Sequence, residues 1–171
     1  MLLEFQTMTE EEMYRMVHGV YSEGSIINAK WRHPEKEDLS REIQEEEQYF
    51  MTFLREKFFP QERNRYYVLE VDEHWVSALR LTKIDDFYYL EALETAPEQR
   101  KKGYGTQIME EVIQLLKKRG PVIIRSNVAK DNWASLATHQ RCGFQIEEEN
   151  GINYRNGEQR DTVYGLIYQG K

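Results

Sequence analysis

The stretch Pro97-Glu98-Gln99-Arg100-Lys101-Lys102-Gly103-Tyr104-Gly105-Thr106 decides the fold of this chain. A strand-like run, residues 87–95, precedes it, and apolar residues recur at helical spacing over residues 107–118 after it. The two glycines therefore fall where a strand turns into a helix, at a point where backbone N–H groups are unpaired and attract anions. The turn predicts a cradle for a diphosphate, to which the three basic side chains add positive charge. The same pattern also fits a plain strand-to-helix turn with solvated basic residues.

The composition is that of one soluble, globular domain. The chain has 171 residues, of which 40 % are apolar and 31 % charged, so a single domain over residues 1–171 can bury a substantial core. No apolar run is long enough to span a membrane, and the first residues do not form a secretory signal. The single cysteine, Cys142, fits a reducing compartment, so we expect a cytoplasmic protein. The net charge of −7 argues against nucleic acid or an anionic membrane as the main partner.

Residues 1–65 are expected to form a strand and two helices. Residues 2–6 suit an edge strand, and Thr9 with Glu12 predicts a capping box for a helix from residue 10 to about residue 21. A second helix is predicted over residues 40–59. We expect residues 22–38 between them to be irregular. Trp31 in this segment is a candidate for stacking on a substrate, or it fills a gap between the helices.

Residues 66–171 are expected to form an α/β core. Runs at residues 66–71, 74–81 and 87–95 predict an antiparallel meander, and residues 122–128 are hydrophobic enough for a central strand. Asp131 or Asn132 begins the next helix, which Gly143 ends. Residues 144–148 and 162–168 suit a closing hairpin, with a polar, mobile loop at about residues 150–160.

Two motifs resemble those of the GNAT superfamily of N-acetyltransferases. Arg100-x-x-Gly103-x-Gly105 matches the core of motif A in full, with Thr95 where Val is usual. The run Asn132-Trp133-Ala134-Ser135-Leu136-Ala137-Thr138-His139-Gln140-Arg141-Cys142-Gly143-Phe144 is similar to motif B, Asn-x-x-Ala/Ser-x-x-x-Tyr-x-x-x-Gly-Phe. The resemblance covers roughly residues 66–168. It implies the α/β (α+β) GNAT fold, a mixed and mostly antiparallel sheet flanked by helices, in which the central parallel strands 87–95 and 122–128 splay apart.

The resemblance implies acetyl-CoA as the acyl donor. It places the diphosphate on the glycine turn, the thioester oxygen near the backbone N–H groups of residues 93–95, and the pantetheine arm against the helix that follows Asn132. The implied donor-binding residues are Leu93, Glu94, Thr95, Arg100, Lys101, Lys102, Gly103, Tyr104, Gly105, Thr106, Asn132 and Ser135. Asn132 is also a good helix N-cap. No His/Cys cluster has metal-ligand spacing, so we expect no metal.

Glu91 is the candidate base. The run Tyr89-Leu90-Glu91-Ala92-Leu93 is similar to a strand of polyamine and related acetyltransferases in which this Glu acts through water. In a regular strand, Glu91 shares a face with Tyr89, Leu93 and Thr95, opposite Glu94. Tyr89 and Glu94 are candidates for contact with the acceptor, and Glu94 is the second choice as base. Alternatively, Glu91 pairs across the sheet with Arg80 or Arg125.

His139 is the main departure from the family pattern. Its motif-B position is usually a tyrosine, the presumed acid toward the CoA thiolate, and an imidazolium could donate that proton. The alternatives are that His139 only hydrogen-bonds the CoA sulfur or packs within its helix. Tyr104 is a weaker candidate for the acid. Cys142 lies three residues further on, but no nucleophile elbow or triad order is visible, which favours a packed thiol.

The resemblance implies an acetyl-CoA-dependent N-acetyltransferase that transfers acetyl to a primary amine of a small molecule, an amino-acid derivative or a peptide. The rival hypothesis is a catalytically inactive member of the same fold that serves as an acyl-CoA-binding sensor or scaffold. The histidine at position 139 keeps this rival open. The sequence identifies neither the acceptor nor the acyl chain preference, and it leaves open a homodimer.

Overall fold

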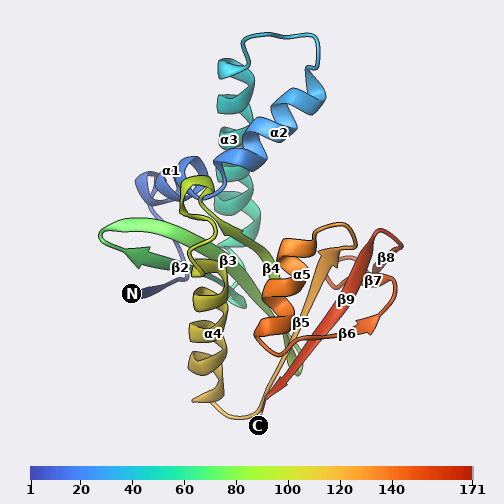
Figure 1. Ribbon diagram of the computed structural model, residues 1–171. Coiled ribbons are helices and arrows are strands. Elements are labelled where there is room, and N and C mark those ends of the chain that lie inside the picture. The colour runs from blue at the N-terminus through green and yellow to red at the C-terminus, as the bar shows by residue number, and fades with distance from the viewer. Residues whose placement is uncertain (171) are drawn as a thin grey trace.

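The computed structural model describes residues 1–170, and a seven-stranded sheet forms its centre (Figure 1). The strand order is β1-β2-β3-β4-β5-β9-β6, and all neighbours are antiparallel except β4 and β5, which are parallel. This arrangement confirms the mixed, mostly antiparallel sheet. The strands of the sheet are β1 Leu2–Phe5, β2 Asn64–Val71, β3 His74–Ile84, β4 Phe87–Thr95, β5 Val122–Ala129, β6 Gln145–Glu148 and β9 Val163–Gly170.

Residues 1–170 contain five α-helices: α1 Glu10–Gly19, α2 Ser22–Arg32, α3 Ser40–Phe53, α4 Tyr104–Lys117 and α5 Trp133–Arg141. The capping box of Thr9 and Glu12 is present at the start of α1, as predicted. A π-helix, Leu54–Phe58, extends α3, and a 3₁₀ turn, Pro97–Gln99, follows β4. None of the helices within residues 1–170 has both the length and the hydropathy needed to cross a membrane.

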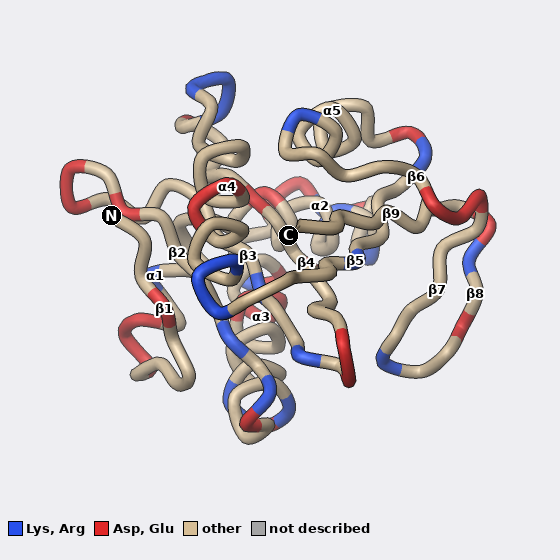
Figure 2. The backbone as a smooth tube through the Cα atoms, turned by 90° about the horizontal axis from the view of Figure 1, so that it is seen from below, with Lys and Arg blue, Asp and Glu red and all other residues tan. Residues whose placement is uncertain are grey.

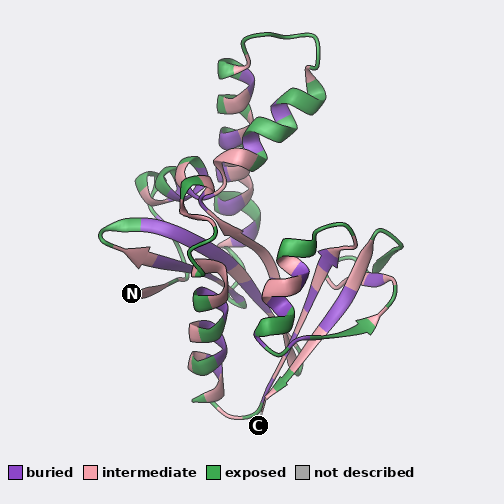
Figure 3. Ribbon diagram, in the orientation of Figure 1, coloured by how far each residue is buried: buried purple, intermediate pink, exposed green. Residues whose placement is uncertain are grey.

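The prediction of an irregular segment between two N-terminal helices is wrong, because residues 22–32 form helix α2. Only the small residues Ser25 and Ala29 of this helix are buried, and α2 packs chiefly against α3. Ile26, Ile27 and Trp31 face outward, so no apolar stripe marks the helix in the sequence. The α2–α3 hairpin projects from the body, and most of the surface of α2 is exposed (Figures 1 and 3).

The polar segment at residues 150–160 also differs from expectation. It forms a second, two-stranded sheet from β7 Gly151–Asn153 and β8 Glu158–Arg160. Gly157 adopts a φ of +75° in the turn between them. The hairpin carries basic positions at its turn and on β8, separated by an acidic one (Figure 2). An ordered hairpin therefore replaces the expected mobile loop, while β6 and β9 do pair as predicted.

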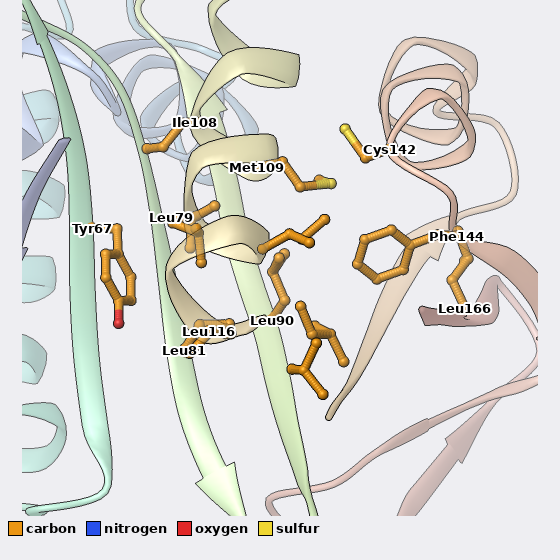
Figure 4. Close-up of a cluster of buried hydrophobic side chains, with 14 of the residues drawn as sticks. Tyr67, Leu79, Leu81, Leu90, Ile108, Met109, Leu116, Cys142, Phe144 and Leu166 are labelled. Carbon is orange, nitrogen blue, oxygen red and sulfur yellow. The ribbon is translucent and has the colours of Figure 1, made fainter. Parts of the chain in front are cut away.

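Two apolar clusters pack on opposite faces of the sheet. The larger one joins α4 and α5 to the sheet through Ile108, Met109, Leu90 and Phe144 (Figure 4). The second joins α1, α3 and the π-helix to the other face through residues that include Met16, Leu54, Phe58 and Tyr66. The sheet is thus covered on both faces, and its functional features lie where β4 and β5 separate.

Candidate active site

The parallel strands β4 and β5 pair over only three residues each. Tyr88, Tyr89 and Leu90 lie opposite Ile124, Arg125 and Ser126, and the pairing ends there. Beyond Leu90, β4 continues to Thr95 and β5 to Ala129 without facing each other in register. This separation is the predicted splay, and it leaves backbone groups of residues 91–95 without a strand partner on that side.

A β-bulge lies in β4 just past Leu90, the last residue of this strand that pairs with β5. Arg80 of β3 faces Glu91, whereas Ala78 faces Glu94, so two residues of β4 oppose one residue of β3. Ala92 adopts a φ of +52°, which is strained for a residue with a Cβ. The Tyr21 hydroxyl donates to the Ala92 carbonyl at 2.6 Å and accepts from the Tyr66 hydroxyl at 2.8 Å. These bonds hold the strained residue from the face of the sheet that α1 and α3 cover.

The bulge corrects the expectation that Glu91 shares a face with Leu93 and Thr95. Leu93 packs against the cluster under α4, and the Thr95 hydroxyl lies 3.1 Å from the Ser77 hydroxyl. Glu94 instead reaches the Arg100 guanidinium at 3.0 Å. The extra residue at Ala92 inverts the alternation, so Glu91 and Glu94 lie on one face and Leu93 and Thr95 on the other.

The glycine turn joins the end of β4 to α4. Lys101 and Gly103 adopt φ values of +62° and +84°, and Gly103 is the N-cap of α4. A Cβ on Gly105 would lie 3.3 Å from the Thr95 hydroxyl and 3.8 Å from the Thr138 methyl group, so this residue brings three elements together. The first turn of α4 presents backbone N–H groups at the open end of the splay. Such a cradle fits a diphosphate.

The basic side chains of the turn differ in whether they already form ion pairs within the protein. Arg100 pairs with Glu23 of α2 and with Glu94, and its Nε donates to the Thr95 carbonyl at 3.3 Å. These carboxylates raise the pKa of Arg100 and compensate its charge. Lys101 and Lys102 are exposed, which leaves them as the cations of the turn that can meet a phosphate. Tyr104 is partly buried against the core, and Thr106 lies in the first turn of α4.

Helix α5 forms the opposite wall. The Asn132 carbonyl oxygen Oδ1 accepts from the Ser135 amide at 3.0 Å, which confirms Asn132 as the N-cap. Gly143 ends the helix with a φ of +89°, also as predicted. Thr138 faces Gly105 across the gap between α4 and α5.

His139 lies inside the protein, with 2 % of its surface exposed. Its Nδ1 lies 2.8 Å from the carbonyl oxygen of Ser135, and its Nε2 lies 3.2 Å from the Ser126 hydroxyl. A proton on Nδ1 satisfies both contacts, because Nε2 then accepts from Ser126. Burial lowers the pKa of His139 and so favours the neutral ring. This geometry favours a packed, hydrogen-bonded histidine over direct proton donation.

Glu91 borders a cavity of about 250 Å³ beside the splay. Its carboxylate contacts the Arg155 guanidinium at 2.6 Å and the Arg80 guanidinium at 3.5 Å. Arg125 pairs with Glu147 instead, so of the two partners expected across the sheet only Arg80 is in place. The residues that line the cavity are Arg80, Tyr89, Leu90, Glu91, Ala92, Asn127, Asn153, Arg160 and Val163.

Tyr89 is buried in the wall of this cavity. Its hydroxyl accepts from the Asn127 amide at 3.0 Å, and its ring meets that of Tyr154 edge-on at 5.2 Å. Burial raises the pKa of Tyr89 to about 12, so the phenol remains protonated. The structure therefore brings Tyr89 and Glu91 together, while Glu94 lies at the glycine turn.

Trp31 lies apart from this cavity. It is 79 % exposed in the last turn of α2 and does not contribute to the lining. Cys142 is also separate: its thiol donates to the Thr106 carbonyl at 3.8 Å, and burial raises its pKa to about 11. The Cys142 thiol therefore stays protonated, in keeping with a packed cysteine. Residues 1–170 contain no group of three His, Cys, Asp or Glu side chains that could hold a metal ion.

Sequence reasoning missed Tyr21, Asn127, Arg155 and Arg160. Arg155 and Arg160 lie in the segment expected to be a mobile loop, and only the β7–β8 hairpin brings them beside β4. Asn127 lies in a strand that the sequence marks only as hydrophobic enough to be central, and the structure places its side chain in the cavity wall. Tyr21 carried no signal, because its partner is a backbone carbonyl 71 residues away.

A sequence profile of the Acetyltransferase (GNAT) family matches residues 26–144, and the chain belongs to this family. Among solved structures, the chain is similar to PaiA N-acetyltransferase from Thermoplasma acidophilum, solved in complex with coenzyme A, with a TM-score of 0.65 and 14 % identity over 99 % of both chains. It is also similar to the N-acetyltransferase PseH from Campylobacter jejuni, with a TM-score of 0.61 and 16 % identity over 100 % of this chain and 98 % of the other.

A third similar structure is the ribosomal-protein-S18-alanine N-acetyltransferase from Escherichia coli, with a TM-score of 0.58 and 16 % identity over 99 % of this chain and 94 % of the other. At these identities the likeness concerns the fold. No curated protein matches the chain. The family and the fold are therefore as the two motifs predicted.

Proposed function

We propose that this protein is an acetyl-CoA-dependent N-acetyltransferase that transfers acetyl directly to a primary amine of a small molecule, an amino-acid derivative or a peptide. The observation that carries the proposal is that the splay, the glycine turn and the Glu91 cavity adjoin one another. The splay of β4 and β5 begins at Leu90 and Ser126, the glycine turn closes one end of it, and the Glu91 cavity adjoins the other. A donor in the splay would thus reach from the turn to the cavity.

The donor site is proposed as follows. The N–H groups at the start of α4 hold the diphosphate, with Lys101 and Lys102 as nearby cations. The pantetheine arm lies in the splay beside α5, where Asn132 and Ser135 border it. The amide of Thr95 already donates to the Glu94 carboxylate at 3.2 Å. Of the two remaining amides, those of Leu93 and Glu94, we assign Leu93, directly after the bulge, to the thioester oxygen.

Transfer requires a neutral amine nitrogen to attack the acetyl carbonyl, after which the thiolate of CoA leaves. Glu91 is the group we assign to receive the proton of the amine, directly or through water, because it borders the cavity at the point where the splay opens. Arg80 and Arg155 fix the position of this carboxylate. Glu94 is the second candidate, but its partners Arg100 and Glu23 hold it at the turn.

We assign His139 to the support of the donor wall. Its link to Ser126 joins α5 to the last residue of β5 that pairs with β4. The proton that the leaving thiolate needs then comes from another source. Tyr104 remains a candidate, although it packs against the core.

The rival, a catalytically inactive acyl-CoA-binding protein, gains support from the two guanidinium groups on Glu91 and from the histidine at position 139. A thiol-release assay over a panel of primary amines separates the two hypotheses. Turnover with any amine supports the enzyme. Binding of acetyl-CoA without turnover on the whole panel would favour the sensor or scaffold.

A further inference from the structure

The charge around the Glu91 cavity is opposite in sign to that of the molecule. The chain carries a net charge of −7, yet Arg80 and Arg160 line the cavity and Arg155 lies against its one lining carboxylate, Glu91. Counting Glu158, the partner of Arg160, three guanidinium groups face two carboxylates here. The cavity therefore has one net positive charge, which favours an anionic group on whatever enters it.

The three arginines differ in how many of their guanidinium N–H groups already have partners in the protein. Arg155 has two partners, because it contacts Glu91 at 2.6 Å and the Thr82 hydroxyl at 2.8 Å. Arg80 contacts Glu91 at 3.5 Å, and its buried Nε has no acceptor within residues 1–170. Arg160 pairs at 2.9 Å with Glu158, but both side chains are about half exposed, at 50 % and 53 %. Such an exposed pair is weak, so the Arg160 guanidinium can exchange Glu158 for a ligand.

A carboxylate is the anionic group that suits this site. A guanidinium presents two parallel N–H donors that match the two oxygens of a carboxylate. Glu91 in the same cavity offers the opposite charge, which suits the ammonium form of the amine before it loses its proton. A ligand that carries both groups would satisfy both sides of the cavity at once.

We infer that the acceptor is zwitterionic: an amino acid or short peptide whose amine is directed to Glu91 and whose carboxylate binds Arg160. This inference rests on the proposed function and narrows its acceptor class. Polyamines are disfavoured by the same observation, because a second ammonium group would meet Arg80 and Arg160 without a free carboxylate to pair with.

The test compares dipeptides and tripeptides that have a free C-terminal carboxylate with the same peptides as C-terminal amides, and with 1,4-diaminobutane. Peptides are used because the amide leaves their distant amine chemically similar. The wild-type protein should prefer the free acids by about tenfold or more in kcat/KM. Arg160→Gln should remove most of this preference and Arg160→Lys should retain part of it. Arg41→Gln, an exposed arginine on α3 that pairs with Glu45, is the matched control and should change nothing.

Equal rates for the acids and amides, or a preference for the diamine, would overturn the inference and leave the proposed function intact. If no amine is acetylated, the proposed function fails, and calorimetry of the same peptides on CoA-loaded protein still decides the inference. Tighter binding of the acids than of the amides supports it, and equal binding overturns it. The wild-type comparison needs no variant, so misfolding of an Arg160 variant would not affect the outcome.

Discussion

The Tyr21 hydroxyl donates a 2.6 Å hydrogen bond to the carbonyl of Ala92, the residue that forms the bulge in β4. Tyr21 lies between α1 and α2. The bond therefore connects the junction of these two helices to the bulge, which places Glu91 and Glu94 on the same face of β4. Burial raises the pKa of Tyr21 well above its usual value, which keeps the hydroxyl protonated and able to donate.

Tyr21→Phe should therefore lower kcat more than it changes the Kd for acetyl-CoA. The Ala92 carbonyl loses its donor and the buried Tyr66 hydroxyl loses its acceptor, and the two losses together should cost about 2 kcal/mol of unfolding free energy. Denaturant unfolding and steady-state kinetics check these two effects, with Tyr14→Phe, at an exposed position of α1, as the control. An unchanged kcat in Tyr21→Phe would show that the bond does not position the catalytic strand.

Glu91→Gln should reduce kcat by about a hundredfold, the lower range of a lost general base. Its rate should also rise less with pH than that of the wild-type protein, because the variant lacks the group that takes the proton. A pH–rate profile with an amine that the wild-type protein acetylates measures both effects, and Glu45→Gln, at an exposed position of α3, is the matched control. Wild-type turnover in Glu91→Gln would remove Glu91 as the base.

Arg155→Gln should weaken binding of the amine acceptor without weakening binding of acetyl-CoA. The substitution removes the contacts of the β7–β8 hairpin to Glu91 and Thr82, so we expect a higher KM for the amine and an unchanged Kd for acetyl-CoA. Two titrations, one with each substrate, separate the effects. Arg119→Gln, whose exposed side chain pairs with Glu4, is the control. A comparable loss of acetyl-CoA binding would contradict the assignment of the hairpin to the acceptor cavity.

His139 predicts a loss of stability in acid. Because burial lowers its pKa in the folded state, the unfolded chain takes up this proton first as the pH falls. The contribution of the neutral ring is fully present above the ordinary pKa of about 6.5 and declines as the pH falls below it. His139→Gln should flatten this part of the curve of unfolding free energy against pH, below about pH 6.5. His74→Gln, at an exposed position of β3, is the control, and equal slopes in all three proteins would contradict the prediction.

Much of the fold was predictable because its signals are local. The observed bounds of β4, residues 87–95, are those predicted, and Asn132 and Gly143 begin and end α5 as their cap chemistry requires. The glycine turn was predictable for the same reason. A position with positive φ before a helix favours glycine, so the residue type itself indicates the turn.

The remaining features depend on contacts between distant segments. Helix α2 buries only Ser25 and Ala29, so the apolar pattern could not reveal it. The bulge at Ala92 depends on the register with β3 and on Tyr21, and it reversed the predicted faces of Leu93 and Thr95. Arg155 reaches Glu91 across 64 residues of sequence, by way of a hairpin whose strands have three residues each.

The central claim is that the glycine turn and the splay hold acetyl-CoA, and calorimetric titration with acetyl-CoA tests it most directly. The wild-type protein should show saturable binding with a Kd below about 1 mM. Gly105→Ala should weaken it by about tenfold, because its Cβ would crowd the Thr95 hydroxyl beside the turn, whereas Gly24→Ala has open space around it and should bind as the wild type does. No saturable heat from the folded wild-type protein would contradict the claim.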